Sequence, residues 1–322
     1  MPRKRGPVSA AKTRQERQRV RKKIGKLSEA ALPGATVDRY RRAMTVFYTW
    51  LTRGLLPWPE EEEEVDEALC KWIDEAWQEG EPRGLVGDAL SGFHHHVRGL
   101  IGKLHGAWKL HGAWGRHELP ARSWCAPDFA VMALACLAEQ WLWYDVAICI
   151  TVAFCIFLRT GEILAACKNW FSFGPEGLIH LSLKDSKGTS RKGGVEAISW
   201  RSEWLQKRLR FYLRGLKPGD RLLQRTPAQF RACWNDLRQA AGLPEDMSPY
   251  SLRRGGATWF FRTTGSWDRT LDVGRWGTMR TAKVYVNAAL GDFSVIQMPP
   301  QQRAKLKALA QQWIPHCRLL QQ

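Results

Sequence analysis

Residues 248–259 read SPYSLRRGGATW, and this stretch decides how the rest of the chain is interpreted. It begins like a helix, because Ser248 is a good N-cap residue and Pro249 suits the first helical position. Arg253 and Arg254 then fall in the first turn, where helices favour acidic residues. Two glycines follow, and each costs about 1 kcal/mol of helix propensity relative to alanine. So much positive charge and so little side-chain volume at one helix start require an explanation.

The chain as a whole is basic. Its 322 residues include 49 Lys and Arg against 31 Asp and Glu, a formal net charge of +18. Residues 1–26 carry eleven Lys and Arg and one acid, Glu16, which is +10, so residues 27–322 carry the other +8. A polyanion is the natural partner, either nucleic acid or an anionic membrane surface. The PRKRGP start is typical both of a nuclear localisation patch and of a phosphate-binding arm.

Several classes of protein are disfavoured by the sequence. No apolar region typical of a signal peptide follows the basic start, and the longest apolar run, 146–158, has 13 residues and is too short to span a bilayer. The eight cysteines lack Cys-x-x-Cys spacing and indicate reduced, buried thiols. The histidine run 94–96 lacks ligand partners, so we expect a solvated helix face and no metal site. The expected location is the nucleus in a eukaryote, and otherwise the cytoplasm, without secretion.

The hydrophobic pattern predicts a mainly α fold with a small antiparallel β-sheet. Period-two alternation in 177–200, on both sides of a Gly- and Lys-rich turn, predicts a β-hairpin. KLHGAW occurs at 103–108 and again at 109–114, and we interpret it as a short duplication at a loop. Helical patterns are found at 37–51, 65–77, 85–104, 130–142, 145–158, 203–213, 229–240, 249–264, 268–273, 278–289 and 303–313.

These elements predict four regions. Residues 1–34 form a basic flexible tail, 35–117 a helical domain, 118–295 a larger, mostly helical domain with the hairpin, and 296–322 a C-terminal helical tail. The last helix is expected either to pack on its own core or to dock on a neighbouring subunit.

Four features of the second domain carry the candidate chemistry. In FLRTGEIL, Arg159 follows a long apolar helix, where an unpaired buried charge is costly, and Glu162 is a candidate partner. The second feature is a basic hairpin tip, and the third is the SLRRGGAT stretch. The fourth is GRWGTMRTAKVYV, a Gly-Arg-Trp turn followed by a helix that carries Tyr285. Taken alone, Tyr285 also fits a core tyrosine on a stripe with Ala282 and Ala289.

In this order and spacing, the four features resemble the tyrosine recombinase (phage integrase-like) family. The resemblance covers about 37–290 and is strongest in 155–165 and 248–290, and the GGAT variant suggests a relative from a eukaryotic mobile element. It implies a helical, SAM-like core-binding domain that binds DNA, followed by a catalytic domain. It also implies that the partner is double-stranded DNA and that no metal or other cofactor is needed.

The resemblance also implies roles for individual residues. Arg159 and Arg253 bind the scissile phosphate, because planar guanidinium groups match two non-bridging oxygens. Tyr285 is the nucleophile and forms a 3′-phosphotyrosyl link, which leaves a free 5′-hydroxyl. Trp276 stands where relatives have His or Trp and donates through its indole N–H. The two glycines after Arg254 let a neighbouring backbone or helix come close.

A hairpin lysine protonates the leaving oxygen in this family, and Lys187 fits that position better than Lys184. Further basic residues are predicted to contact DNA: Lys184, Arg191, Lys192, Arg254, Arg275, Arg41 and Arg42. For Arg254, a contact to a backbone phosphate or a surface charge fits at least as well as a catalytic role. Because recombination joins two duplexes, relatives assemble as tetramers on two DNA sites, and a homo-oligomer is expected.

Tyr250 departs from the family pattern, since many relatives have His three residues before the second arginine. Tyrosine donates a hydrogen bond to phosphate but is a poor general base near pH 7. Three functions therefore stay open. They are a site-specific recombinase or integrase, a catalytically impaired, domesticated DNA-binding protein derived from one, and an enzyme like a type IB topoisomerase. The compact size and LRRGGAT favour the recombinase.

Overall fold

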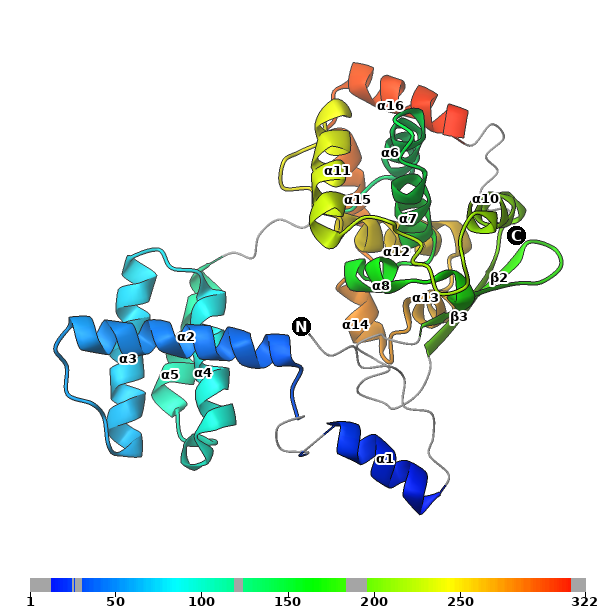
Figure 1. Cartoon of the computed structure of the whole chain (residues 1–322). Coiled ribbons are helices and arrows are strands. Elements are labelled where there is room, and N and C mark those ends of the chain that lie inside the picture. The colour runs from blue at the N-terminus through cyan, green and yellow to red at the C-terminus, as the bar shows by residue number, and fades with distance from the viewer. Residues whose placement is uncertain (1–12, 25, 27–30, 119–123, 184–195, 314–322) are drawn as a thin grey trace. The chain divides into compact units, whose positions relative to one another are not determined.

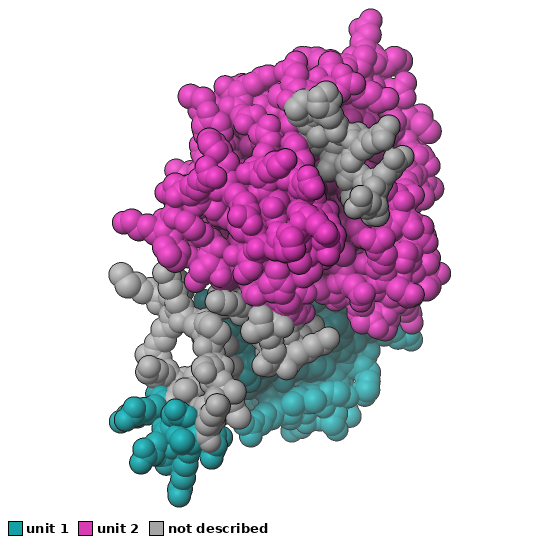
Figure 2. Space-filling view, turned by 90° about the vertical axis from the view of Figure 1, so that its right-hand side faces the viewer, with its two compact units in different colours: residues 1–121 teal, residues 122–322 magenta. Residues whose placement is uncertain are grey.

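The computed structural model describes residues 13–24, 26, 31–118, 124–183 and 196–313 (Figure 1). The chain divides into two compact units, Met1–Ala121 and Arg122–Gln322, which Figure 2 colours separately. Each unit has a hydrophobic core of its own. The mainly helical fold with one small antiparallel sheet confirms the predicted fold class.

The described part of the first unit is helical. Its helices are α1 (Arg14–Ile24), α2 (Gly34–Arg53), α3 (Glu62–Gln78), α4 (Arg83–His96), the short 3-10 helix η1 (Arg98–Leu100) and α5 (His105–His117). Helix α2 packs against α4, and α3 packs against α5. Phe47 on α2 lies at the centre of this core, with its ring edge-on to Trp72 and Phe93.

Three predictions for the first unit are corrected. Residues 14–24 form α1, within the stretch predicted to be a flexible tail. The repeated KLHGAW residues were assigned to a loop, but most of them lie on α5, and the predicted helix 85–104 ends at His96. The reason is the spacing of Ala107 and Trp114, which are seven residues apart, lie on one helical face and are both buried.

The second unit contains the larger core. Its helices are α6 (Asp128–Gln140), α7 (Tyr144–Cys155), α8 (Thr160–Ala165), the short 3-10 helix η2 (Lys168–Trp170), α10 (Glu203–Arg214), α11 (Pro227–Ala240), α12 (Ser251–Thr264), α13 (Trp267–Gly274), α14 (Met279–Lys283), α15 (Ala288–Ile296) and α16 (Pro300–Trp313). Helix α7 is buried on every side, and α6 and α12 pack against it. Helix α16 packs against α6 of its own chain, and Figure 1 shows it at the top of the second unit.

The sheet has the strand order β1 (Phe171–Phe173), β2 (Leu178–Leu183), β3 (Glu196–Arg201), with antiparallel pairing throughout. The pairing of β2 with β3 confirms the predicted hairpin, and Leu183 is paired with Glu196 at its described end. Strand β1 was not predicted, because three residues are too few to show a period-two pattern.

Helix α12 can lie close to its neighbours because of Gly255 and Gly256. A Cβ atom at 255 would lie 2.1 Å from the carbonyl oxygen of Ala126, and one at 256 would lie 2.0 Å from that of Phe154 on α7. Both distances are far below van der Waals contact. The expected close approach of a neighbouring backbone to these glycines is confirmed, and it fixes the position of the first turn of α12.

The predicted helix 278–289 is wrong. Helix α14 ends at Lys283, and α15 begins at Ala288, where the side chain of Asn287 caps it by accepting a hydrogen bond from the backbone N–H of Leu290 at 2.9 Å. Residues 284–287, here called the Tyr285 link, therefore lie between two helices. The sequence shows a continuous apolar stripe there, but a capping residue interrupts it.

Candidate active site

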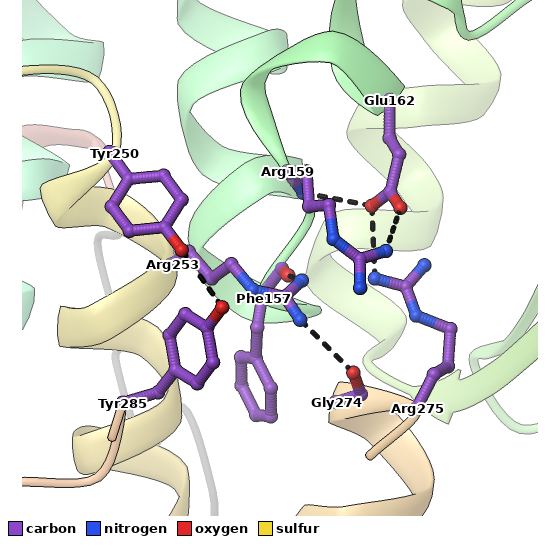
Figure 3. A network of polar contacts seen from close by, with 8 residues as sticks. All are labelled: Phe157, Arg159, Glu162, Tyr250, Arg253, Gly274, Arg275 and Tyr285. Atoms are coloured by element: carbon purple, nitrogen blue, oxygen red, sulfur yellow. Dashed lines mark hydrogen bonds and ion pairs between the residues drawn. The ribbon is translucent and has the colours of Figure 1, made fainter. Parts of the chain in front are cut away.

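Four segments that are far apart in the sequence converge in the second unit. They are the N-terminus of α8, the first turn of α12, the turn after α13 and the Tyr285 link, and they carry Arg159, Arg253, Trp276 and Tyr285. Figure 3 shows the side chains of Arg159, Arg253 and Tyr285 directed toward the same region. These four predicted residues are therefore brought together.

Arg253 is the innermost cation of the site. Its side chain is fully buried and donates from Nη1 to the carbonyl oxygen of Phe157 and from Nη2 to that of Gly274, at 3.2 Å for the latter. Its Cζ lies 4.9 Å from the ring centroid of Tyr285. Burial, together with the neighbouring charges of Arg275 and Arg159, lowers the pKa of Arg253 to about 10. Arg253 is therefore a poorly hydrated cation at neutral pH, and such a group binds an anion strongly.

Glu162 holds two arginines in place. Its carboxylate accepts from the backbone N–H of Arg159 at 2.8 Å and from Nη1 of Arg159 at 2.5 Å. It also accepts from Nη2 of Arg275 at 2.9 Å. Burial alone would raise the pKa of Glu162, but the charges and hydrogen bonds of the two arginines hold it below its ordinary value. The predicted pairing of Arg159 with Glu162 is confirmed.

Arg275 was predicted to contact DNA, and the structure places its side chain inside the protein, 6% exposed. It ends α13 in the left-handed region, with φ of 56°, and donates a backbone hydrogen bond to Asp272. Its Nε and Nη1 have no hydrogen-bond partner among the described residues. The structure therefore shows Arg275 as the second cation on Glu162, a contact that the sequence did not indicate because 113 residues separate the two.

Tyr285 packs its ring against the core and turns its hydroxyl into the site. The ring is stacked on Trp276, with centroids 4.9 Å apart and an interplanar angle of 17°. Its hydroxyl oxygen accepts a hydrogen bond from the hydroxyl of Tyr250 at 2.9 Å. Burial would raise the pKa of Tyr285, but this hydrogen bond and the charges of Arg253 and Arg159 lower it below its ordinary value. The Tyr285 hydroxyl therefore ionises at a lower pH than that of a free tyrosine.

Tyr250 is the donor in this pair. Burial and its hydrogen bond to Tyr285 raise the pKa of Tyr250 to about 12, so the Tyr250 hydroxyl keeps its proton when that of Tyr285 is lost. Trp276 lies between Tyr285 and Phe157, with its indole Nε1 buried and without a partner in the described part of the chain. The predicted donor role of Trp276 toward phosphate stays a prediction.

The other predicted DNA-binding residues lie in different places. Arg254 donates from Nη1 to the carbonyl oxygen of Val284 at 3.0 Å, so it contacts the Tyr285 link. Arg41 and Arg42 lie on α2 in the first unit, where both interact with Asp38. The lysine and arginine residues of the hairpin tip lie outside the described residues: Lys184, Lys187, Arg191 and Lys192.

The described end of the hairpin is close to the site. Strand β3 packs against α13, and the charge of its first residue, Glu196, acts on both Arg159 and Arg275. Glu196 and its strand partner Leu183 therefore mark the described end of the hairpin near the arginines, and the predicted general acid falls on residues outside the described ones. Which lysine serves as the acid stays a prediction.

The described residues contain no group of three His, Cys, Asp or Glu side chains that could bind a metal ion. None of the helices formed by these residues is long and apolar enough to cross a membrane. No disulfide joins the cysteines of the described ranges, and most of those cysteines are buried.

Neither a protein-family model nor a curated protein matches this sequence. Several solved structures do. A lambda integrase dimer bound to a COC′ core site has a TM-score of 0.59 at 13% identity, over 84% of this chain and 94% of that chain. The Tn1549 transposon integrase in complex with transposon right end DNA has a TM-score of 0.59 at 12% identity, over 91% and 98%.

A third solved structure has a similar fold. XerH, a site-specific recombinase bound to palindromic difH substrate in a post-cleavage complex, has a TM-score of 0.55 at 14% identity, over 86% of this chain and 79% of that chain. At such low identities the likeness bears on the fold and not on the activity. Each match covers more than four fifths of the chain and therefore includes residues of both compact units. The chain therefore has the fold of the tyrosine recombinases and integrases.

Proposed function

We propose that this protein is a site-specific DNA recombinase that cuts and rejoins double-stranded DNA through a covalent bond to Tyr285. The observation that carries this proposal is the convergence of a phenol hydroxyl and two guanidinium groups, from three remote segments, around one region (Figure 3). The likeness in fold to integrases whose structures contain DNA supports it.

The first step is binding of the scissile phosphate. Arg159 has a side chain that is about one third exposed, and Glu162 fixes its guanidinium group from behind. Arg253 offers Nε, which lacks a partner among the described residues. Two planar guanidinium groups bind two non-bridging oxygens and stabilise the charge of a pentacoordinate phosphorus. The low-dielectric surroundings of Arg253 strengthen this interaction.

The second step is attack by Tyr285. Its oxygen forms a bond to phosphorus while the bond to the 5′-oxygen breaks, and the products are a 3′-phosphotyrosyl link and a free 5′-hydroxyl. Tyr250 donates to the attacking oxygen and stabilises its anionic form, so the Tyr285 proton is lost to water and not to Tyr250. Lys187 protonates the leaving 5′-oxygen. A 5′-hydroxyl reverses the reaction, which conserves the bond energy, so that rejoining needs no ATP.

Binding outside the site relies on charge. The net charge of +18 supplies affinity for the DNA backbone that does not depend on sequence. Arg41 and Arg42 on α2 add phosphate contacts from the first unit. Because recombination joins two duplexes, four subunits assemble on two DNA sites.

The test uses a pool of duplexes with a nick at a fixed position and random flanking sequence. Cleavage next to the nick releases a short fragment and traps the covalent adduct, which resists denaturing electrophoresis. We expect adducts with the wild-type protein and with Tyr144→Phe, a control at an exposed tyrosine on α7. We expect none with Tyr285→Phe. Sequencing of the trapped DNA then identifies the target.

A second function has one observation in its favour. Tyr250 occupies the position at which relatives have His and acts as a donor, so no base faces Tyr285 from there. A protein that keeps its affinity for DNA but has lost the chemistry would show salt-sensitive binding to the same pool without any adduct. That result would overturn the recombinase proposal and support a DNA-binding protein derived from such an enzyme.

A further inference from the structure

Helix α12 carries a row of polar side chains on the face that looks toward the Tyr285 link. Arg254, Thr258 and Arg262 are spaced by four residues and therefore lie on one face of the helix. We call this row the α12 stripe. Arg253, which belongs to the candidate active site, is the neighbour of its first member, so one helix carries both the phosphate-binding arginine and the stripe.

Each member of the α12 stripe makes hydrogen bonds to the backbone of residues 284–288. Arg254 donates to the carbonyl oxygen of Val284 at 3.0 Å. The Thr258 hydroxyl donates to the carbonyl oxygen of Tyr285 at 3.3 Å and accepts from the N–H of Asn287 at 3.1 Å. Arg262 donates to the carbonyl oxygen of Ala288 at 2.6 Å. Three of these four hydrogen bonds go to the Tyr285 link, and the fourth goes to Ala288, the first residue of α15.

The Tyr285 link depends on such partners because it lies between α14 and α15. Backbone groups outside a helix ladder bond to side chains or to water. Val284, Asn287 and Ala288 are exposed, so water also reaches this backbone, whereas the Thr258 side chain that bonds to it is buried. Thr258 is 4% exposed, so its hydroxyl is a buried polar group that the link satisfies on both sides. Arg262 also forms an ion pair with Asp292 on α15 at 2.7 Å, which ties the helix after the link to the same stripe.

The link in turn fixes the nucleophile. With the carbonyl of Tyr285 held by Thr258, its ring stacks on Trp276 and its hydroxyl meets that of Tyr250, all within one chain. The distance from the hydroxyl to Arg253 is then set by α12 itself. A reacting atom that is displaced by about 1 Å can lose 100-fold in rate.

We propose that Arg254, Thr258 and Arg262 are positioning residues that hold Tyr285 in the active site of its own subunit. The proposal rests on the recombinase function above. It assigns Arg254 to the backbone of the link in the DNA-free protein. It also implies that each subunit cleaves DNA with its own tyrosine, because the stripe and Arg253 lie on the same helix.

The first test removes the Thr258 hydroxyl. Thr258→Val keeps the shape of the side chain and abolishes both hydrogen bonds to the link, whereas Thr258→Ser keeps them. We expect single-turnover adduct formation at saturating nicked duplex to be about 10- to 100-fold slower in Thr258→Val. Thr258→Ser should stay within about threefold of the wild type, because a serine hydroxyl makes the same two hydrogen bonds. DNA affinity should not change in either.

The matched control is Thr263→Val. Thr263 lies on the same helix but is exposed, and its hydroxyl bonds to the carbonyl of Trp259 within α12. All variants are compared well below their melting temperatures, so that a loss of stability does not count as a loss of rate. Equal rates for Thr258→Val and Thr263→Val would overturn the positioning role, and so would a slow Thr258→Ser.

The second test mixes two inactive proteins, Tyr285→Phe and Arg253→Lys, on the same nicked duplexes. If each subunit attacks DNA with its own Tyr285, the mixture should give no more adduct than either protein gives alone. If Tyr285 instead enters the active site of a neighbouring subunit, adducts would form on the Arg253→Lys polypeptide, which keeps its tyrosine and is distinguished by a size tag. That result would overturn the inference. Absence of adducts from the wild-type protein would instead overturn the proposed function, so the two failures are distinguishable.

Discussion

The hydrogen bond between Tyr250 and Tyr285 has a direction, and the direction decides which phenol ionises first. The Tyr250 hydroxyl donates, which lowers the pKa of Tyr285 below its ordinary value and raises that of Tyr250 to about 12. The sequence showed only that Tyr250 stands where many members of the resembled family have a histidine. The contact between these residues, which are 35 positions apart, makes Tyr250 a hydrogen-bond donor to Tyr285, the proposed nucleophile.

Tyr250→Phe should shift the pH dependence of adduct formation. The phenolate of Tyr285 is the reactive form, so the rate rises as the pH rises through its pKa. Removing the donor raises that pKa, and the rising limb moves to higher pH. A hydrogen bond to an anion contributes about 1.4 kcal/mol or more, so we expect a shift of about one pH unit.

The measurement is the single-turnover adduct rate between pH 6 and about 10. Tyr250 is 38% exposed and loses only a hydroxyl, so its thermal unfolding should match that of the wild type. A profile for Tyr250→Phe that is lower at every pH but not shifted would exclude this role.

Glu162→Gln should destabilise the fold by about 3 kcal/mol at neutral pH, because a buried carboxylate between two arginines loses its charge. The folded pKa of Glu162 lies below the unfolded value of about 4.3. Its stabilisation is therefore complete above about pH 4.3 and is lost as the pH falls through the folded pKa. Denaturant unfolding at several pH values should show the difference shrinking in acid.

The control is Glu176→Gln. Glu176 pairs with Arg201 at 2.9 Å, but both are exposed, so the change should be below about 0.5 kcal/mol. A Glu162→Gln protein as stable as this control would show that the two arginines are held by other contacts.

At the scale of elements, α12 determines the geometry of the site. Its first turn carries Arg253, its glycine face lies against the backbone of Ala126 and Phe154, and its polar stripe contacts the Tyr285 link. The two glycines weaken its helix propensity but allow α12 to lie close to Ala126 and, at Gly256, to the backbone of α7. Packing here outweighs local propensity.

Gly255→Ala and Gly256→Ala should each destabilise the second unit by about 2 kcal/mol or more, because the new methyl group would lie 2.1 or 2.0 Å from a carbonyl oxygen. The control is Gly161→Ala on α8, where a Cβ would meet nothing within 4 Å. Its unfolding free energy should stay the same or rise slightly, since alanine favours a helix. A tolerated alanine at 255 and 256 would mean that α12 can move away from its neighbours.

At the scale of the whole molecule, the positive charge is concentrated at the N-terminus, whereas the hydrophobic residues form one core in each compact unit. Each of the two compact units has its own core, whereas more than half of the net charge of +18 falls on residues 1–26. Under the proposed function the basic start adds affinity for DNA, and none of its described residues belongs to either core.

Deletion of residues 1–26 should weaken binding to duplex DNA of random sequence and flatten its salt dependence. Each phosphate contact that is lost reduces the slope of log K against log salt by about 0.9. Titrations at several salt concentrations measure this slope, and the wild-type protein serves as the reference. The adduct rate at saturating DNA should not change, because the active site lies in the second unit. An unchanged slope would mean that the tail does not contact phosphate.

The sequence by itself determined the fold class and the β2–β3 hairpin, because both follow from local periodicity. The resemblance carried by its motifs also pointed to Arg159, Arg253, Trp276 and Tyr285, which the structure brings close together. The sequence failed at 278–289, where the apolar stripe predicted one helix and the structure has two.

Only the tertiary structure decided how these residues act together. The ion pair of Arg275 with Glu162, the donor role of Tyr250 and the stripe that holds the Tyr285 link all join residues between 26 and 113 positions apart. Hydrogen bonds and pKa values depend on distances in space and on burial, and neither is encoded in the spacing of residues along the chain. The physical chemistry of the site therefore arises when the chain folds.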